Sequence, residues 1–104
     1  MNTAPLPPFL SQFATYQPEF VDQVARIRQE AYYTPGALDV KTKLLIALAL
    51  DMFSGSITGT ELLTARARAA GATDAEIAEV VKVCYSVAGL QRLSTAAHAF
   101  GATS

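Results

Sequence analysis

Apolar residues recur at helical spacing along most of this chain, and no segment alternates as a β-strand does. The first apolar segment, Phe9–Phe13, predicts either a short helix or a docking segment. A long helix is then predicted to open at Gln17-Pro18, because proline suits the first turn of a helix. It is predicted to end at Thr34-Pro35-Gly36, where proline and glycine interrupt helical structure.

Two further helices are predicted in the middle of the chain. Asp39 is a candidate N-cap for a helix over Val40–Phe53, whose centre, LLIALAL, is apolar on every side. Such a helix is expected to be buried all round, either inside the domain or between subunits. After a loop over Ser54–Gly59, an alanine-rich helix over Thr60–Ala70 is predicted to end at Gly71, a typical C-cap residue.

The next helix begins with a start motif. Thr73-Asp-Ala-Glu76 is a capping box, in which the threonine hydroxyl accepts from the backbone at Glu76 and the glutamate carboxylate reaches back. The helix that follows places Ile77, Val80, Val81, Cys84, Val87 and Ala88 on one face. Gly89 is predicted to separate it from a last helix that aligns Leu90, Leu93, Ala97 and Phe100. The whole pattern predicts an all-α fold of about five to six helices.

The composition is more apolar and less charged than that of an average globular protein. Hydrophobic residues make up 51% of the chain and charged residues only 16%, against a typical charged share of about 25%. The longest strongly apolar run, Leu44–Leu50, is far shorter than the roughly 20 residues of a membrane-spanning helix. The apolar excess therefore predicts surface that is hidden in an oligomer.

Length, charge and cysteine content bound the domain organisation and the partners. The 104 residues predict a single domain over residues 17–104, preceded by an N-terminal arm over residues 1–16 that contains Pro5, Pro7 and Pro8. The net charge of −1 gives no reason to expect nucleic acid or a membrane as a partner, so neither is predicted. No basic-then-apolar leader opens the sequence, and the single cysteine, Cys84, excludes an intramolecular disulfide, so a cytoplasmic location is expected.

Three segments carry a family resemblance. They are DVKTKLLIALAL (39–50), AGATDAEIAEVV (70–81) with its glycine before a capped helix, and CYSVAG (84–89), where an aromatic and a small pair precede glycine. In this order and spacing they resemble the alkylhydroperoxidase-like, or carboxymuconolactone decarboxylase, family. The resemblance implies the alkylhydroperoxidase-like helical fold, with a helical hairpin at its core. It also implies homo-oligomers (dimers, trimers or hexamers) that bury the LLIALAL helix.

The residues that carry the family's redox chemistry are replaced. Its redox members carry Cys-x-x-Cys, followed by three residues and a histidine, and the resemblance places these positions on Ser56, Gly59 and Leu63. A glutamate that often relays protons falls on Leu44. Peroxide reduction needs a thiolate and a resolving thiol, so the chain is predicted to lack thiol peroxidase activity. Decarboxylase-type members usually keep the histidine, so Leu63 also argues against their usual chemistry.

The most polar stretch beside the predicted buried helix offers the first candidate site. It contains Ser54, Ser56, Thr58, Thr60 and Glu61. These residues either break and cap helices, or they line a pocket. In a pocket, Glu61 is the candidate general base, while the hydroxyls of Ser54, Ser56 and Thr58 are candidates for ligand binding.

The remaining candidates lie further along the chain. Arg66 is either a solvated side chain or a bidentate partner for a ligand carboxylate, and Tyr85 either packs or directs its hydroxyl into a pocket. Cys84 on its apolar stripe is predicted to be a buried structural cysteine, with a one-cysteine peroxidase as the alternative. His98 is predicted to lie at the surface or an interface, with catalysis as the alternative. No second histidine or cysteine is present, so neither a metal site nor a cofactor is predicted.

Three hypotheses for the function stay open. In the first, the chain is a carboxymuconolactone decarboxylase-like protein that binds a small molecule or serves as an assembly partner. In the second, it is a decarboxylase or lactone-processing enzyme that uses Glu61, an arginine and nearby hydroxyls. In the third, it is a stress-related redox protein that works through Cys84 or a partner's thiols. The fold alone does not decide among them, because one fold hosts many functions.

Overall fold

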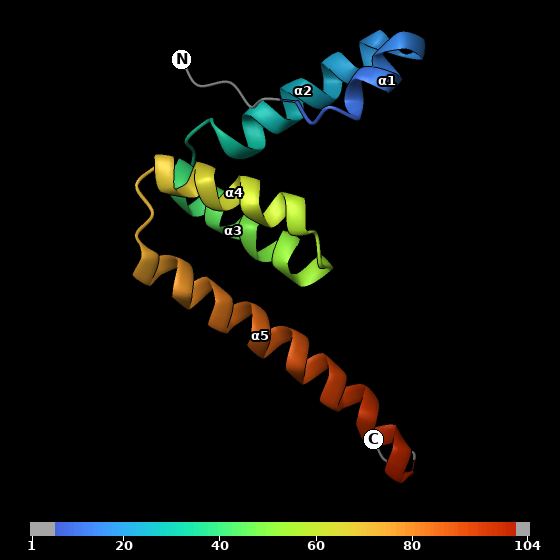
Figure 1. Ribbon diagram of the computed structural model, residues 1–104, viewed down its shortest axis with the longest axis vertical. Helices are drawn as coiled ribbons and strands as arrows, with labels where there is room; N and C mark the ends of the chain where they lie inside the picture. The colour runs from blue at the N-terminus through green and yellow to red at the C-terminus, as the bar shows by residue number, and fades with distance from the viewer. Residues whose placement is uncertain (1–5, 102–104) are drawn as a thin grey trace. The chain divides into compact units, whose positions relative to one another are not determined.

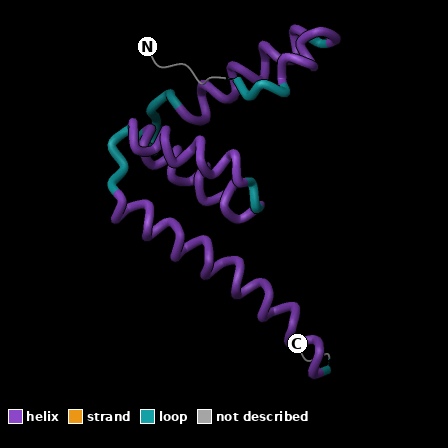
Figure 2. Tube along the Cα trace, in the orientation of Figure 1, coloured by secondary structure: helices purple, strands orange, loops and turns teal. Residues whose placement is uncertain are grey.

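The computed structural model describes residues 6–101 and is helical throughout (Figure 1). Its elements are α1 (Leu10–Tyr16), α2 (Pro18–Tyr32), α3 (Val40–Ser54), α4 (Ile57–Ala69), α5 (Asp74–Ala96) and a short 3₁₀ helix, η1 (Ala97–Phe100). Figure 2 shows loops between the helices and no strand within residues 6–101. The predicted all-α fold of five to six helices is therefore confirmed. Residues 1–5 of the predicted N-terminal arm lie outside the described residues.

The chain divides into two compact units, residues 1–43 and 44–104. In the first unit, α1 and α2 pack against each other and contribute the buried residues Leu10 and Val21. The backbone N–H of Gln17 donates to the carbonyl of Phe13 at 2.7 Å and closes α1, while Pro18 opens α2 as predicted. The apolar segment that begins at Phe9 is thus a helix, longer than predicted. The predicted boundary between an arm and a domain at residue 17 stays a prediction.

The first turn of α3 is fixed by hydrogen bonds that the sequence partly predicts. Asp39 caps α3, because its carboxylate accepts the backbone N–H of Thr42 at 2.8 Å. Hydrogen bonds from the Thr42 side chain, and then from its backbone, lower the pKa of Asp39 below its ordinary value. Lys43 Nζ donates to the carbonyls of Glu30 at 3.1 Å and Thr34 at 2.7 Å. The lysine thereby satisfies one carbonyl oxygen in the last turn of α2, which lacks a donor within the helix, and one in the loop that follows.

In the second unit, α3 and α4 form an antiparallel hairpin (Figure 1). Leu44 and Leu48 of α3 are fully buried, as is Ala67 of α4, and Leu63 of α4 is nearly so. Within the described chain the LLIALAL helix is not buried all round, since Leu50 is 64% exposed. Of the two predicted alternatives, burial inside the domain is therefore wrong, and burial between subunits stays a prediction.

The long helix α5 runs without interruption from Asp74 to Ala96, so the predicted break at Gly89 is wrong. A glycine inside a helix costs only about 1 kcal/mol relative to alanine, which is too little to end a helix that lacks proline. The start of α5 is as predicted: the backbone N–H of Glu76 donates to the Thr73 hydroxyl at 3.1 Å, and the backbone N–H of Thr73 donates to the Glu76 carboxylate at 2.9 Å. None of the 23 residues of α5, all of which the structure describes, is buried.

Candidate functional site

The turn between α3 and α4 holds most of the predicted candidates, and it is shorter than predicted. Only Gly55 and Ser56 separate the two helices, so α4 begins at Ile57 and not at Thr60. Gly55 has φ +79°, a conformation that glycine adopts without steric cost. Ser56 accounts for the early start, because its hydroxyl accepts the backbone N–H of Gly59 at 3.1 Å and caps the helix.

Gly59 lies directly against α3, at a point that the sequence analysis missed. A Cβ atom at this position would stand 2.7 Å from Asp51 Cγ and 2.8 Å from Ser56 Oγ, and would also meet the Asp51 carboxylate oxygen. Position 59 therefore accepts only glycine unless these two side chains move. Asp51 is a carboxylate that follows the apolar LLIALAL run, and this interruption of the run is the sequence signal that could have identified it.

An open hollow of about 320 Å³ lies beside this turn. Its walls combine apolar side chains (Met52 and Ile57), the backbone of Gly55, and polar side chains (Ser56, Thr60 and Glu61). The structure thus brings together Ser56 and Glu61 from the predicted polar stretch. Met52 and Ile57 were missed, because helical periodicity alone does not show which apolar residues border a turn.

The other predicted candidates are not part of this hollow. Ser54 donates its hydroxyl to the Asp51 carbonyl at 3.1 Å within the last turn of α3, and Thr58 is exposed on α4. Arg66 is half-buried on α4, and Tyr85 is 77% exposed on α5.

Cys84, predicted to be buried, is only half-buried, because α5 has no fully covered side. His98 is exposed on η1. The polar residues that line the hollow are therefore Ser56, Thr60 and Glu61.

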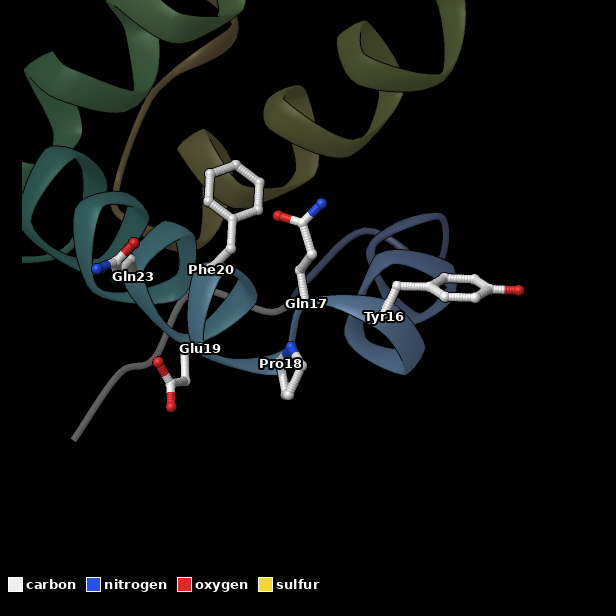
Figure 3. A pocket seen from close by; sticks show the side chains of 6 residues that line it. All are labelled: Tyr16, Gln17, Pro18, Glu19, Phe20 and Gln23. Carbon is white, nitrogen blue, oxygen red and sulfur yellow. The ribbon is translucent and has the colours of Figure 1, made fainter.

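A second and larger hollow, of about 420 Å³, lies at the junction of α1 and α2. Figure 3 shows that its side chains diverge: Gln17 and Phe20 point to one side, whereas Tyr16 and Glu19 point in other directions. Polar groups that converge on one point are typical of a ligand site. This hollow lacks that convergence, and none of the residues predicted as site candidates lines it.

Comparison with known proteins identifies a family. The sequence model of the carboxymuconolactone decarboxylase family matches residues 18–102, which is most of the chain. This chain belongs to the carboxymuconolactone decarboxylase family. The family prediction is thereby confirmed, together with the all-α fold. Neither the curated proteins nor the solved structures contain a match to the chain.

The resemblance to the redox members of the carboxymuconolactone decarboxylase family places their functional residues on four positions that the structure describes. Ser56 caps α4, Gly59 lies against Asp51, and Leu63 and Leu44 are buried in the hairpin. Each of these positions thus has a structural part in the α3–α4 hairpin. The hydroxyl of Ser56 is the single side-chain polar group among them.

The described part of the chain offers neither a metal-binding cluster nor a membrane-spanning helix. Within residues 6–101, no three histidine, cysteine, aspartate or glutamate side chains lie close enough together to hold a metal ion. No helix in that same range combines the length and the apolar character that crossing a bilayer requires.

Proposed function

We propose that this member of the carboxymuconolactone decarboxylase family lacks thiol peroxidase chemistry and acts as a homo-oligomer assembled through α5. One observation carries the proposal: α5 exposes large apolar side chains along its length and buries none of its residues. Leu90 and Leu93, for example, are 64% and 68% exposed. Surface helices gain most of their stability from packing an apolar face, and a contiguous exposed apolar surface marks an interaction site.

The exposed side of α3 supports the same proposal. Ile46, Leu50 and Phe53 are exposed on a helix whose opposite side contributes the buried Leu44 and Leu48. The family resemblance implies that this helix is covered between subunits. A second copy of the chain that covers both α3 and α5 accounts for the apolar excess of the composition.

The loss of peroxidase chemistry is supported by the four replaced positions. A peroxidase of this type needs a thiolate to attack the peroxide and a second thiol to close a disulfide. The Ser56 hydroxyl already accepts a hydrogen bond from the Gly59 backbone, and Gly59, Leu63 and Leu44 offer neither a nucleophile nor a base. The single cysteine lies on α5, away from these positions in the sequence.

Sedimentation velocity over a range of concentrations tests the assembly. We expect the wild-type protein to sediment as a discrete oligomer, and Leu93→Asp to shift it toward the monomer, because a charge placed in an apolar interface is strongly unfavourable. Thr95→Asp is the matched control, since Thr95 is also exposed on α5 but is already polar. A wild-type protein that stays monomeric at every concentration contradicts the proposal.

A peroxide-consumption assay tests the chemical half of the proposal. We expect the wild-type protein and Cys84→Ser to consume peroxide equally slowly, with and without an added dithiol reductant. Turnover by the wild-type protein that disappears in Cys84→Ser would instead support a one-cysteine peroxidase.

The hollow beside the α3–α4 turn favours a second candidate function, the binding of a small molecule. Its volume of about 320 Å³ is at the lower end of the usual range for ligand pockets, and its mostly apolar walls include the residues Thr60 and Glu61. Native mass spectrometry of the gently purified protein is expected to show a stoichiometric adduct that is lost in Glu61→Gln. Thr58→Val is the control, because Thr58 is a neighbour outside the hollow. A clean protein mass without any adduct counts against this candidate.

A further inference from the structure

The hollow beside the α3–α4 turn carries charge of one sign. Among the described residues that line it, Glu61 is the one with a charged side chain, and the walls are otherwise mostly apolar, with Met52 and Ile57 contributing. No lysine, arginine or histidine occurs between residues 44 and 65, the stretch that builds the turn and the helix ends on both sides of it. The hollow is therefore negative, and none of its lining residues supplies a positive charge to an anion.

The N-terminus of α4 borders the same hollow, and a helix N-terminus favours negative charge. Groups of the chain itself already meet this preference. The Asp51 carboxylate lies against Gly59 in the first turn of α4, and the Ser56 hydroxyl accepts the backbone N–H of Gly59 at 3.1 Å. Glu61 lies beyond the first turn, where the effect of the helix dipole has fallen off. The charge of Glu61 therefore decides which ligands the hollow prefers.

We infer that this hollow binds a small amphipathic amine and discriminates against carboxylates of the same size. The inference rests on the small-molecule binding proposed above as the second candidate function, and it adds the chemical class of the ligand. The protonated amino group pairs with the Glu61 carboxylate, while the alkyl part of the ligand packs against Met52 and Ile57. Ile57 is 76% exposed, so a ligand that covers it removes apolar surface from water.

Apolar burial supplies most of the affinity, and the charge supplies the selectivity. Each methylene group of the ligand that becomes buried strengthens binding about fourfold. An ion pair at an exposed side chain such as Glu61 adds at most about fivefold, and a carboxylate at the same place is repelled to a similar extent. A decarboxylase substrate carries a carboxylate by definition, so this preference argues against the decarboxylase hypothesis at this hollow.

A titration with three probes tests the ligand class. n-Hexylamine, 1-hexanol and hexanoate share one alkyl chain and differ in charge at neutral pH, where an alkylamine is protonated as a lysine side chain is. Each is added to the full chain labelled with ¹⁵N, and the backbone amide resonances are followed by NMR. We expect hexylamine to shift the resonances of residues 55–61 with a dissociation constant about tenfold lower than that of hexanoate. The value for 1-hexanol should lie between the two.

Two substitutions of Glu61 separate the charge from the apolar walls. Glu61→Gln should raise the dissociation constant of hexylamine to that of 1-hexanol and leave the value for 1-hexanol unchanged. Glu61→Lys should reverse the order of hexylamine and hexanoate. Because Glu61 is exposed, both variants should keep the fold, which the same spectra report. Glu79→Gln is the matched control, since it removes an exposed carboxylate of α5 that does not line the hollow.

The other outcomes distinguish this inference from the binding function on which it rests. Equal dissociation constants for the three probes, or a preference for hexanoate, overturn the amine class and leave small-molecule binding at the hollow standing. Shifts that spare residues 55–61 place the binding elsewhere and overturn the inference as well. If no probe shifts any resonance and the native mass spectrum shows no adduct, both the inference and the second candidate function fall.

Discussion

The α3–α4 hairpin and α5 have similarly apolar sequences, but they differ in how far their apolar side chains are buried. The hairpin places Leu44, Leu48, Leu63 and Ala67 into a shared core. The helix α5 is longer than either hairpin helix, yet it buries none of its residues. An apolar side chain stabilises a fold only when another surface removes it from water. The comparison teaches that an apolar sequence does not by itself secure burial, because the hairpin helices have a helix of their own unit to pack against and α5 buries none of its residues.

The largest expected effect comes from removing a side chain from the hairpin core. Leu48→Ala should lower the free energy of unfolding by about 2–5 kcal/mol, because Leu48 is fully buried and its loss leaves a cavity. Urea unfolding followed by circular dichroism measures the change. Leu50→Ala on the exposed side of the same helix is the control and should cost less than about 1 kcal/mol. Equal losses at the two positions mean that α3 is covered on both sides.

The two helix caps give the next largest effects, one in each region. Ser56→Ala should destabilise the hairpin by about 1 kcal/mol through the loss of the hydrogen bond to the Gly59 backbone. Thr73→Ala should cost a similar amount at the start of α5, where it dismantles the capping box. Ser56→Asp and Thr73→Asp, which keep a side-chain acceptor, should retain most of the stability. If these rescue variants are no better than alanine, the caps are not what holds the helix starts.

Two glycines sharpen the comparison further, because alanine should have opposite effects at them. At Gly89 in α5 the nearest atoms to a new Cβ belong to the Tyr85 ring at 3.9 Å, an ordinary contact. Gly89→Ala should therefore raise the free energy of unfolding by about 0.5–1 kcal/mol. Gly59→Ala should lower it by about 1 kcal/mol, since the new methyl group displaces the Asp51 and Ser56 side chains. Thermal unfolding of both variants measures the two effects. A stabilising Gly59→Ala would mean that Asp51 and Ser56 leave room for a methyl group at position 59.

The smallest expected effect is the pH dependence that Asp39 contributes at the start of α3. Hydrogen bonds from Thr42 lower its pKa in the folded state, so the folded protein favours the charged carboxylate more than the unfolded chain does. The resulting stability is present above the unfolded pKa of about 3.9, and it is lost as the pH falls through the folded pKa. The difference in stability between the wild-type protein and Asp39→Asn should therefore shrink as the pH falls below about 3.9. A difference that stays constant down to pH 2 is the contrary result.

Local interactions made much of the fold predictable from the sequence. The Asp39 cap, the capping box at Thr73 and the start of α2 at Pro18 all depend on residues within one helical turn, so sequence spacing reveals them. The break expected at Gly89 failed for a physical reason. A single glycine lowers the stability of a helix by only about 1 kcal/mol relative to alanine, and the helix-forming residues on both sides of Gly89 outweigh that cost.

The candidate site was predictable only in part. The polar residues Ser56 and Glu61 stand out in the sequence, and the structure brings them together. Met52 and Ile57 do not stand out, because an apolar residue in a helix gives no sign of whether it borders a turn or enters a core. The openness of α5 was equally hidden, since an apolar pattern predicts burial without identifying the surface that covers it.

The contact between Gly59 and Asp51 couples the mutational tolerance of two helices. Any side chain at position 59, a cysteine included, brings a Cβ atom against the Asp51 carboxylate and the capping Ser56 hydroxyl. A larger residue at position 59 therefore requires the Asp51 and Ser56 side chains to move. Substitutions at positions 51 and 59 are thus expected to be non-additive, with Asp51→Gly relieving part of the cost of a side chain at position 59.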